Sequence, residues 1–152
     1  MSHVVAGKAV VTDLDCLEAV LKQFFPKLQL KRGQKTYKWF GQWVKDYHGD
    51  DAAYKNGIDP KDFGKCEHAI TMEGCNYEIG LVKAPGKEGF TPIWDFWGTG
   101  RQINEYIGKG GEKLMVHYGT EFCNRFAESI GGSANTETDN EDERVIEIEV
   151  NQ

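Results

Sequence analysis

Positive charges and aromatic rings interleave between residues 31 and 45, in the run KRGQKTYKWFGQWVK. Aromatic planes stack on nucleobases and cationic side chains hold phosphates, so this mixture suits a nucleotide or a single-stranded nucleic acid. If the run is a strand or hairpin, alternation places Lys35, Tyr37 and Trp39 on one face and Lys38 on the other. The run therefore predicts a basic, aromatic binding surface.

The tryptophans of this run also allow a second interpretation. Trp39 and Trp43 can pack in the core while the neighbouring lysines solvate the outer face. Five bases without one acid are more than solubility requires, which favours a role in binding. Both interpretations stay open at the level of the sequence.

A second candidate is the run WDFWGTGR at residues 94–101. Its glycines let a ligand approach the backbone, and a following helix would offer free N–H groups to an anion. Arg101 can add a bidentate contact to a phosphate or carboxylate. The alternative is a glycine turn between a strand and a helix, with the tryptophans in the core. Together the two runs predict a ligand-binding set of Arg32, Lys35, Tyr37, Lys38, Trp39, Trp43, Trp97 and Arg101.

Cys66, His68 and Cys75 are candidates for metal or nucleophile chemistry if they meet across a hairpin. Zinc takes four ligands in a tetrahedron, so His48 or Asp95 would have to complete the set. A cysteine–histidine nucleophile pair would use the same residues, but no third group that orients the pair is evident. The sequence predicts no metal, no cofactor and no catalytic residue.

The charge of the chain is segregated. The net charge over 152 residues is −6, and the run SANTETDNEDE at residues 133–143 holds five acids and no base. This composition predicts a solvated acidic linker. No run approaches a membrane span, and the four cysteines form no CxxC pair. We expect a single cytoplasmic domain with reduced thiols and no membrane association.

The hydrophobic pattern predicts mixed secondary structure. Strands are expected at residues 4–11, from residue 28, three times between residues 66 and 97, and at residues 146–150. Helices are expected from residue 14, capped by Thr12 or Asp13 and ended by Pro26, and over residues 101–107 and 111–130. Residues 46–65 read as an excursion loop. This order predicts an α+β fold, a largely antiparallel sheet with two or three helices packed on one face.

Several of these runs together resemble a known family. The helix LDCLEAVLKQF, the runs KCEHAI, NYEIGLV and IWDFWGTG, and a late helix ending in Gly-Gly resemble the hypothetical chloroplast reading frame 35 family, or domain of unknown function 1257. The likeness covers most of residues 1–150, and the excursion at 46–65 and the long acidic linker depart from it. The resemblance implies a small α+β domain found in cyanobacteria, plastids, other bacteria and phages. It implies no established activity, cofactor or catalytic residue.

Three functions are consistent with these observations. The first is a non-enzymatic protein that captures a phosphorylated, nucleotide-like small molecule, for example to sequester it in phage–host conflict, with homo-oligomers sharing pockets. The second is an adaptor that docks on a partner protein such as an ATPase. The third is an enzyme, in which Cys66, His68 or Asp95 would converge in one pocket. We expect the first.

Overall fold

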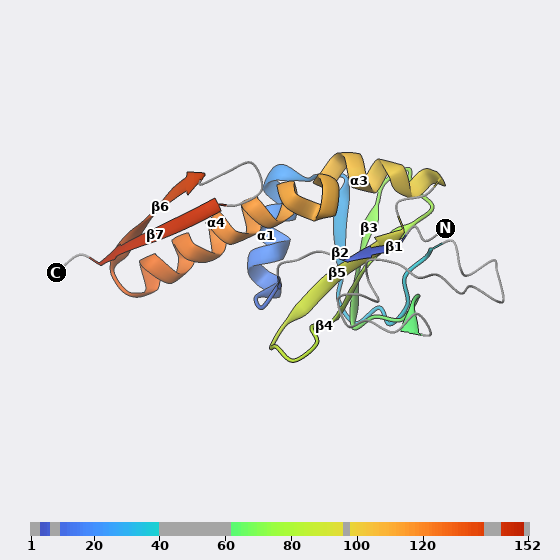
Figure 1. The fold of residues 1–152 in the computed structure, drawn as a ribbon, viewed down its shortest axis with the longest axis horizontal. Helices are drawn as coiled ribbons and strands as arrows, with labels where there is room; N and C mark the ends of the chain where they lie inside the picture. Colours follow the sequence, from blue (N-terminus) through green and yellow to red (C-terminus); the bar gives the residue numbers. More distant parts are fainter. Residues whose placement is uncertain (1–3, 7–9, 40–61, 96–97, 139–143, 151–152) are drawn as a thin grey trace.

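The fold is seen in a computed structural model that describes residues 4–6, 10–39, 62–95, 98–138 and 144–150. Five strands form one antiparallel sheet in the spatial order β1-β5-β4-β3-β2 (Figure 1). The strands are β1 (Val4–Ala6), β2 (Leu28–Lys31), β3 (His68–Met72), β4 (Glu78–Lys83) and β5 (Phe90–Asp95). Helices accompany this sheet, so the predicted α+β class with an antiparallel sheet is confirmed.

Turn chemistry explains how β3, β4 and β5 follow one another so closely. Gly74 between β3 and β4 has φ 75°, and Gly86 between β4 and β5 has φ 66°. Side chains other than glycine rarely adopt this left-handed region, so glycine is suited to both turns. The register pairs Ile70 with Ile79 and Gly80 with Ile93, which brings the central residues of the three strands side by side.

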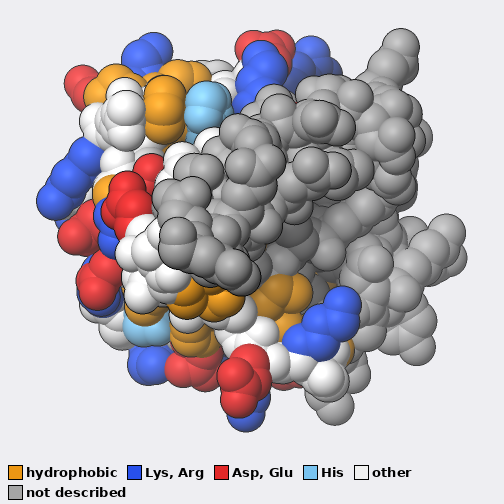
Figure 2. All heavy atoms as spheres, turned by 90° about the vertical axis from the view of Figure 1, so that its left-hand side faces the viewer, with side chains coloured by type: hydrophobic (Ala, Val, Ile, Leu, Met, Phe, Trp, Pro, Cys, Tyr) orange, Lys and Arg blue, Asp and Glu red, His pale blue; other side chains and the backbone are white. Residues whose placement is uncertain are grey.

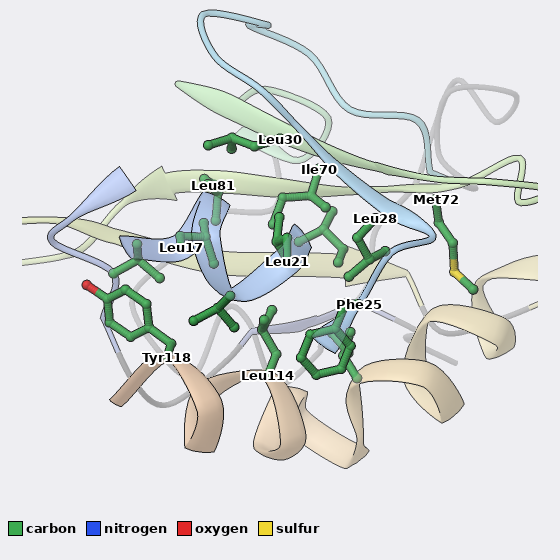
Figure 3. Packing of buried hydrophobic residues seen from close by; sticks show 14 of the residues in the cluster. Leu17, Leu21, Phe25, Leu28, Leu30, Ile70, Met72, Leu81, Leu114 and Tyr118 are labelled. Atoms are coloured by element: carbon green, nitrogen blue, oxygen red, sulfur yellow. The ribbon is translucent and has the colours of Figure 1, made fainter. Parts of the chain in front are cut away.

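One hydrophobic cluster joins the sheet to the helices α1 (Leu14–Phe24), α3 (Arg101–Ile107) and α4 (Glu112–Ser129). Figure 3 shows Leu17 and Leu21 of α1 between strand residues such as Leu81 and the α4 residue Leu114. Burial of such side chains contributes roughly 1.5–3 kcal/mol each. This cluster is the main core among the described residues.

Helix α1 begins and ends as its sequence predicts. The Asp13 carboxylate accepts a hydrogen bond from the Cys16 N–H at 3.0 Å, which caps the first turn. The entry to α1 is also held from α4, because the Tyr118 hydroxyl accepts hydrogen bonds from the N–H groups of Thr12 and Asp13 at 2.9 and 3.0 Å. The strand predicted over residues 4–11 is seen as β1 and a separate bridge between Val11 and Phe90, while residues 7–9 lie outside the description.

Helix α4 packs against α1, and its inner half belongs to the main hydrophobic cluster. The residues at intervals of four along one ridge are Leu114, Tyr118, Phe122, Phe126 and Ile130. The first two are 1% and 4% exposed, whereas Phe122, Phe126 and Ile130, which closes the helix, are 38%, 49% and 41% exposed. The first half of the ridge is therefore buried and the second half is exposed. That half extends past the five-stranded sheet (Figure 1).

The C-terminal part forms a hairpin. Strands β6 (Gly132–Thr138) and β7 (Arg144–Val150) pair in antiparallel register, with Ala134 opposite Ile148. The hairpin lies along the outer half of α4 in Figure 1. The predicted last strand is present, but the predicted acidic linker over 133–143 is wrong for residues 133–138. Residues 133–138 contain threonines, which favour strands, and β6 forms seven residue pairs with β7. These two factors outweigh the polar composition of the segment. Residues 139–143 lie outside the description.

Candidate functional site

The basic, aromatic run crosses the second face of the sheet instead of forming a regular strand. After β2 the chain turns at Gly33, which has φ 79°. It makes a single bridge from Thr36 to Lys65, and the Tyr37 N–H donates to the Gly64 carbonyl at 2.9 Å. The predicted alternation of a strand or hairpin therefore does not apply to the described residues of this run. Trp43 lies outside the described residues, as do positions 46–61 of the expected excursion.

Tyr37 and Trp39 are core residues of this second face. They are 3% and 7% exposed and share a cluster with Phe63, Cys66, Ala69 and Ile93. The Tyr37 ring fills the space over Gly80, where a Cβ atom would overlap it. The Trp39 ring packs edge-on against Phe63 at a centroid distance of 5.4 Å. Neither ring offers an open face to a base, so the expectation that they stack on a ligand is corrected to a packing role.

Two of the four predicted cations are already neutralised. The Arg32 guanidinium lies 2.6 Å from the Asp15 carboxylate, and the Lys35 ammonium lies 2.8 Å from that of Glu67. The Lys35 contact lowers the pKa of Glu67, which keeps this carboxylate ionised. Both pairs are exposed and contribute little to stability. They also remove most of the field that these two cations would offer an anion.

Lys38 differs, because only its backbone is engaged. Its N–H donates to the Glu78 Oε1 atom at 2.9 Å, and the Gln34 amide donates to the same oxygen at 3.2 Å. Within the described part of the chain, the exposed Lys38 ammonium has no carboxylate partner. The buried carboxylate of Glu78 thus fixes the backbone that presents a free cation.

The glycine turn after β5 packs against Tyr77, the residue that directly precedes β4. Gly98–Gly100 form a 3-10 turn that leads directly into α3. Gly100 packs against the Asp95 carbonyl and the Tyr77 ring, and a Cβ atom there would overlap that carbonyl. The Thr99 carbonyl accepts a hydrogen bond from the Cys75 thiol at 3.3 Å. Arg101 follows, exposed and without a carboxylate partner among the described residues. Trp97 lies outside the description.

Each of the two predicted runs contacts a residue at the start of β4, but in different clusters, since Tyr77 belongs to the main core cluster and Tyr37, next to Lys38, belongs to the second one. Lys38 is tied to Glu78, and the turn that carries Arg101 is packed on Tyr77. Burial, and next the nearby Asp95 carboxylate, raise the pKa of Tyr77, so its hydroxyl stays protonated. Lys38, Tyr77, Glu78 and Arg101 are named here the β4-start site.

The β4-start site mixes charges of both signs. Glu78 is 9% exposed and Asp95 is 1% exposed, so one carboxyl group is buried at the start of β4 and another at the end of β5. Their strands are neighbours in the sheet and are paired from Gly80 and Ile93 to Lys83 and Phe90. The start of β4 therefore combines an exposed lysine with a buried glutamate.

Cys66, His68 and Asp95 do not converge. The Cys66 thiol donates to the Gln34 carbonyl at 3.2 Å, and burial raises its pKa to about 11, which removes the thiolate that a nucleophile needs. The His68 Nδ1 atom accepts from the Gly33 N–H at 2.9 Å, and its ring lies edge-on to Phe90. No group of three metal-binding side chains occurs among the residues that the structure describes. The enzyme alternative receives no support from these contacts.

Sequence reasoning missed Tyr77 and Glu78 as site residues. One feature could have identified Glu78, namely a glutamate that opens the otherwise apolar run EIGLV, since an acid there needs donors from elsewhere in the chain. Tyr77 has no comparable feature, because its role depends on the packing of Gly100.

Comparisons with family models, curated proteins and solved structures gave no match for this chain. The family resemblance of the sequence therefore stays a prediction. In the described part of the chain, no helix is long and apolar enough to cross a membrane.

Proposed function

We propose that this chain is a non-enzymatic binding protein that captures a phosphorylated, nucleotide-like small molecule at the β4-start site. The observation that carries this proposal is the selective pairing of the cations. Arg32 and Lys35 are neutralised by acids, whereas Lys38 and Arg101 are exposed and have no acidic partner among the residues that the structure describes. The two cations come from runs far apart in sequence, of which one is tied to Glu78 and the other packs on Tyr77.

The mixed charge of the site supports a nucleotide over a bare anion. Lys38 and Arg101 attract phosphate, but the buried carboxyl groups of Glu78 and Asp95 oppose any purely anionic ligand. A ligand that has both phosphate oxygens and N–H donors can satisfy cations and acceptors together. Nucleotides combine these groups in one molecule, and inorganic phosphate does not.

Isothermal titration calorimetry with a panel of ribonucleoside phosphates and cyclic dinucleotides tests the proposal, with inorganic phosphate as the comparison ligand. We expect at least one nucleotide to bind more tightly than phosphate. Lys38→Glu and Arg101→Glu should each weaken that binding by about tenfold or more, because an attractive contact becomes repulsive. The affinity should also fall as salt is added.

Lys87→Glu is the matched control for these charge reversals. Lys87 is an exposed lysine in the turn between β4 and β5, at the opposite end of β4 from the site. The same change in net charge there should leave the affinity almost unaltered. Equal weakening by Lys87→Glu would indicate a general field effect, and unaltered binding in the two site variants would remove the β4-start site from the proposal.

A further inference from the structure

The carboxylate of Glu78 has one oxygen engaged and one oxygen open. Its Oε1 atom accepts from the Lys38 N–H at 2.9 Å and from the Gln34 amide at 3.2 Å. Its Oε2 atom has no hydrogen-bond partner among the residues that the structure describes. This oxygen reaches the surface, since it is not one of the fully enclosed side-chain atoms that lack a partner in the described chain. Glu78 therefore presents one fixed, open acceptor beside the exposed Lys38.

Thr71 supplies a second polar group on the same face of the sheet. It lies directly opposite Glu78 in the antiparallel register of β3 and β4, so the two Cβ atoms are about 4.5–5.5 Å apart. Thr71 is half-buried, and its hydroxyl makes no hydrogen bond to other described residues. A hydroxyl group donates as well as accepts. The open Glu78 oxygen and the Thr71 hydroxyl thus form an adjacent acceptor and donor.

Attraction by charge does not distinguish one nucleotide from another, because every nucleotide carries phosphate. Lys38 attracts the phosphate whichever base is attached to it. The described acidic and basic side chains are also interspersed on the face that Figure 2 shows, so this face carries a mixed field and not a single-sign one. Selection among nucleotides therefore depends on short-range hydrogen bonds to the base.

We infer that Glu78 and Thr71 select a base with an exocyclic amino group next to an unprotonated ring nitrogen, the edge that adenine and cytosine present. This inference rests on the proposed capture of a nucleotide at the β4-start site. The amino group donates to the Glu78 Oε2 atom, and the ring nitrogen accepts from the Thr71 hydroxyl. Hypoxanthine and uracil carry a carbonyl oxygen beside a protonated ring nitrogen instead. Their carbonyl oxygen would face the carboxylate and leave both acceptors without a donor.

Isothermal titration calorimetry with the 5′-monophosphates of adenosine, inosine, cytidine and uridine tests this inference. Adenosine and inosine differ only by the exchange of the amino group for an oxygen and by the ring proton, as do cytidine and uridine. We expect the amino member of at least one pair to bind wild type about tenfold more tightly than its oxo partner. Glu78→Gln should abolish or reverse this preference. The donors at Lys38 and Gln34 hold the amide oxygen of the new side chain, so its NH₂ group replaces Oε2 and presents a donor.

Glu88→Gln is the matched control for the loss of charge. Glu88 is an exposed glutamate in the turn between β4 and β5, at the opposite end of β4 from Glu78, and its replacement should leave the preference unchanged. Thr71→Val is a second variant that leaves Glu78 intact. It should lower the preference about threefold or more, because one of the two hydrogen bonds to the base is lost.

Lys38→Glu separates this inference from the proposed function. Because the four nucleotides share the phosphate, this variant should weaken the binding of amino and oxo members alike, by about tenfold or more. Binding that depends on Lys38 but shows the same order of preference in wild type and in Glu78→Gln would overturn the inference and not the proposed function. The absence of binding by all four nucleotides would overturn both.

Discussion

Single side-chain contacts decide how the second face of the sheet is built. Tyr37 occupies the space that Gly80 leaves on β4, and Glu78 holds the backbone of Lys38. The sequence shows Tyr37 beside cations. The same pattern is expected for a ring that stacks on a bound base and for a ring that packs in the core. The absent side chain at position 80 determines which of the two forms, because only glycine admits the ring so close to the strand.

Gly80→Ala should destabilise the chain by about 1–3 kcal/mol, because the new methyl group overlaps the Tyr37 ring. Urea unfolding measures this change. In a Tyr37→Ala background the same substitution should cost only a few tenths of a kcal/mol, since the overlapping ring is gone. Equal costs in the two backgrounds would show that Tyr37 does not pack on Gly80.

His68 should make stability depend on pH. Burial, and next the positive charge of Lys35, lower the pKa of His68 in the folded chain, so the unfolded chain binds the proton more readily. The stability that neutral His68 provides is complete above its ordinary pKa of about 6.5 and is lost as the pH falls below it. Protonation would also end the acceptor role of Nδ1 toward Gly33.

His68→Asn keeps an acceptor for the Gly33 N–H and does not titrate. The difference in urea midpoint between pH 7.5 and pH 5 should therefore be smaller in this variant than in wild type. Identical pH dependence in the two proteins would mean that His68 has no altered affinity for protons in the folded state.

At the scale of elements, the sequence predicted what depends on local pattern. The α1 helix follows from an N-cap at Asp13 and an apolar stripe, and α3 spans the predicted residues 101–107. Periodicity places Phe122 and Phe126 on one ridge of α4 but does not encode which elements cover that ridge, and both side chains are exposed. The β6 strand was missed because its composition is polar and its partner β7 supplies the pairing.

The segment at 34–38 should depend on Glu78 for its position. Glu78→Ala leaves the Lys38 N–H and the Gln34 amide without their acceptor and should cost about 1–3 kcal/mol. Glu78→Gln is the control, because its amide oxygen still accepts and the loss should be smaller. Urea unfolding of both variants measures the difference, and an alanine variant as stable as wild type would rule out this tether.

At the scale of the whole molecule, the sequence located the site only in part. Lys38 belongs to the first predicted run and Arg101 to the second, and both are members of the β4-start site. Arg32 and Lys35 have the same chemistry, but their acids at Asp15 and Glu67 come from other elements. Which cations stay free is a property of the tertiary fold, and a single sequence without that fold gives no way to separate them.

The most direct measurement of the central claim is mass spectrometry of small molecules released by denaturing the purified chain. Wild type and Lys87→Glu should release the same phosphorylated, nucleotide-like compound in comparable, near-stoichiometric amounts. The double variant Lys38→Glu/Arg101→Glu should release little or none, because both free cations of the site are reversed. Equal amounts from the double variant and wild type would contradict the β4-start site as the place where this protein holds its ligand.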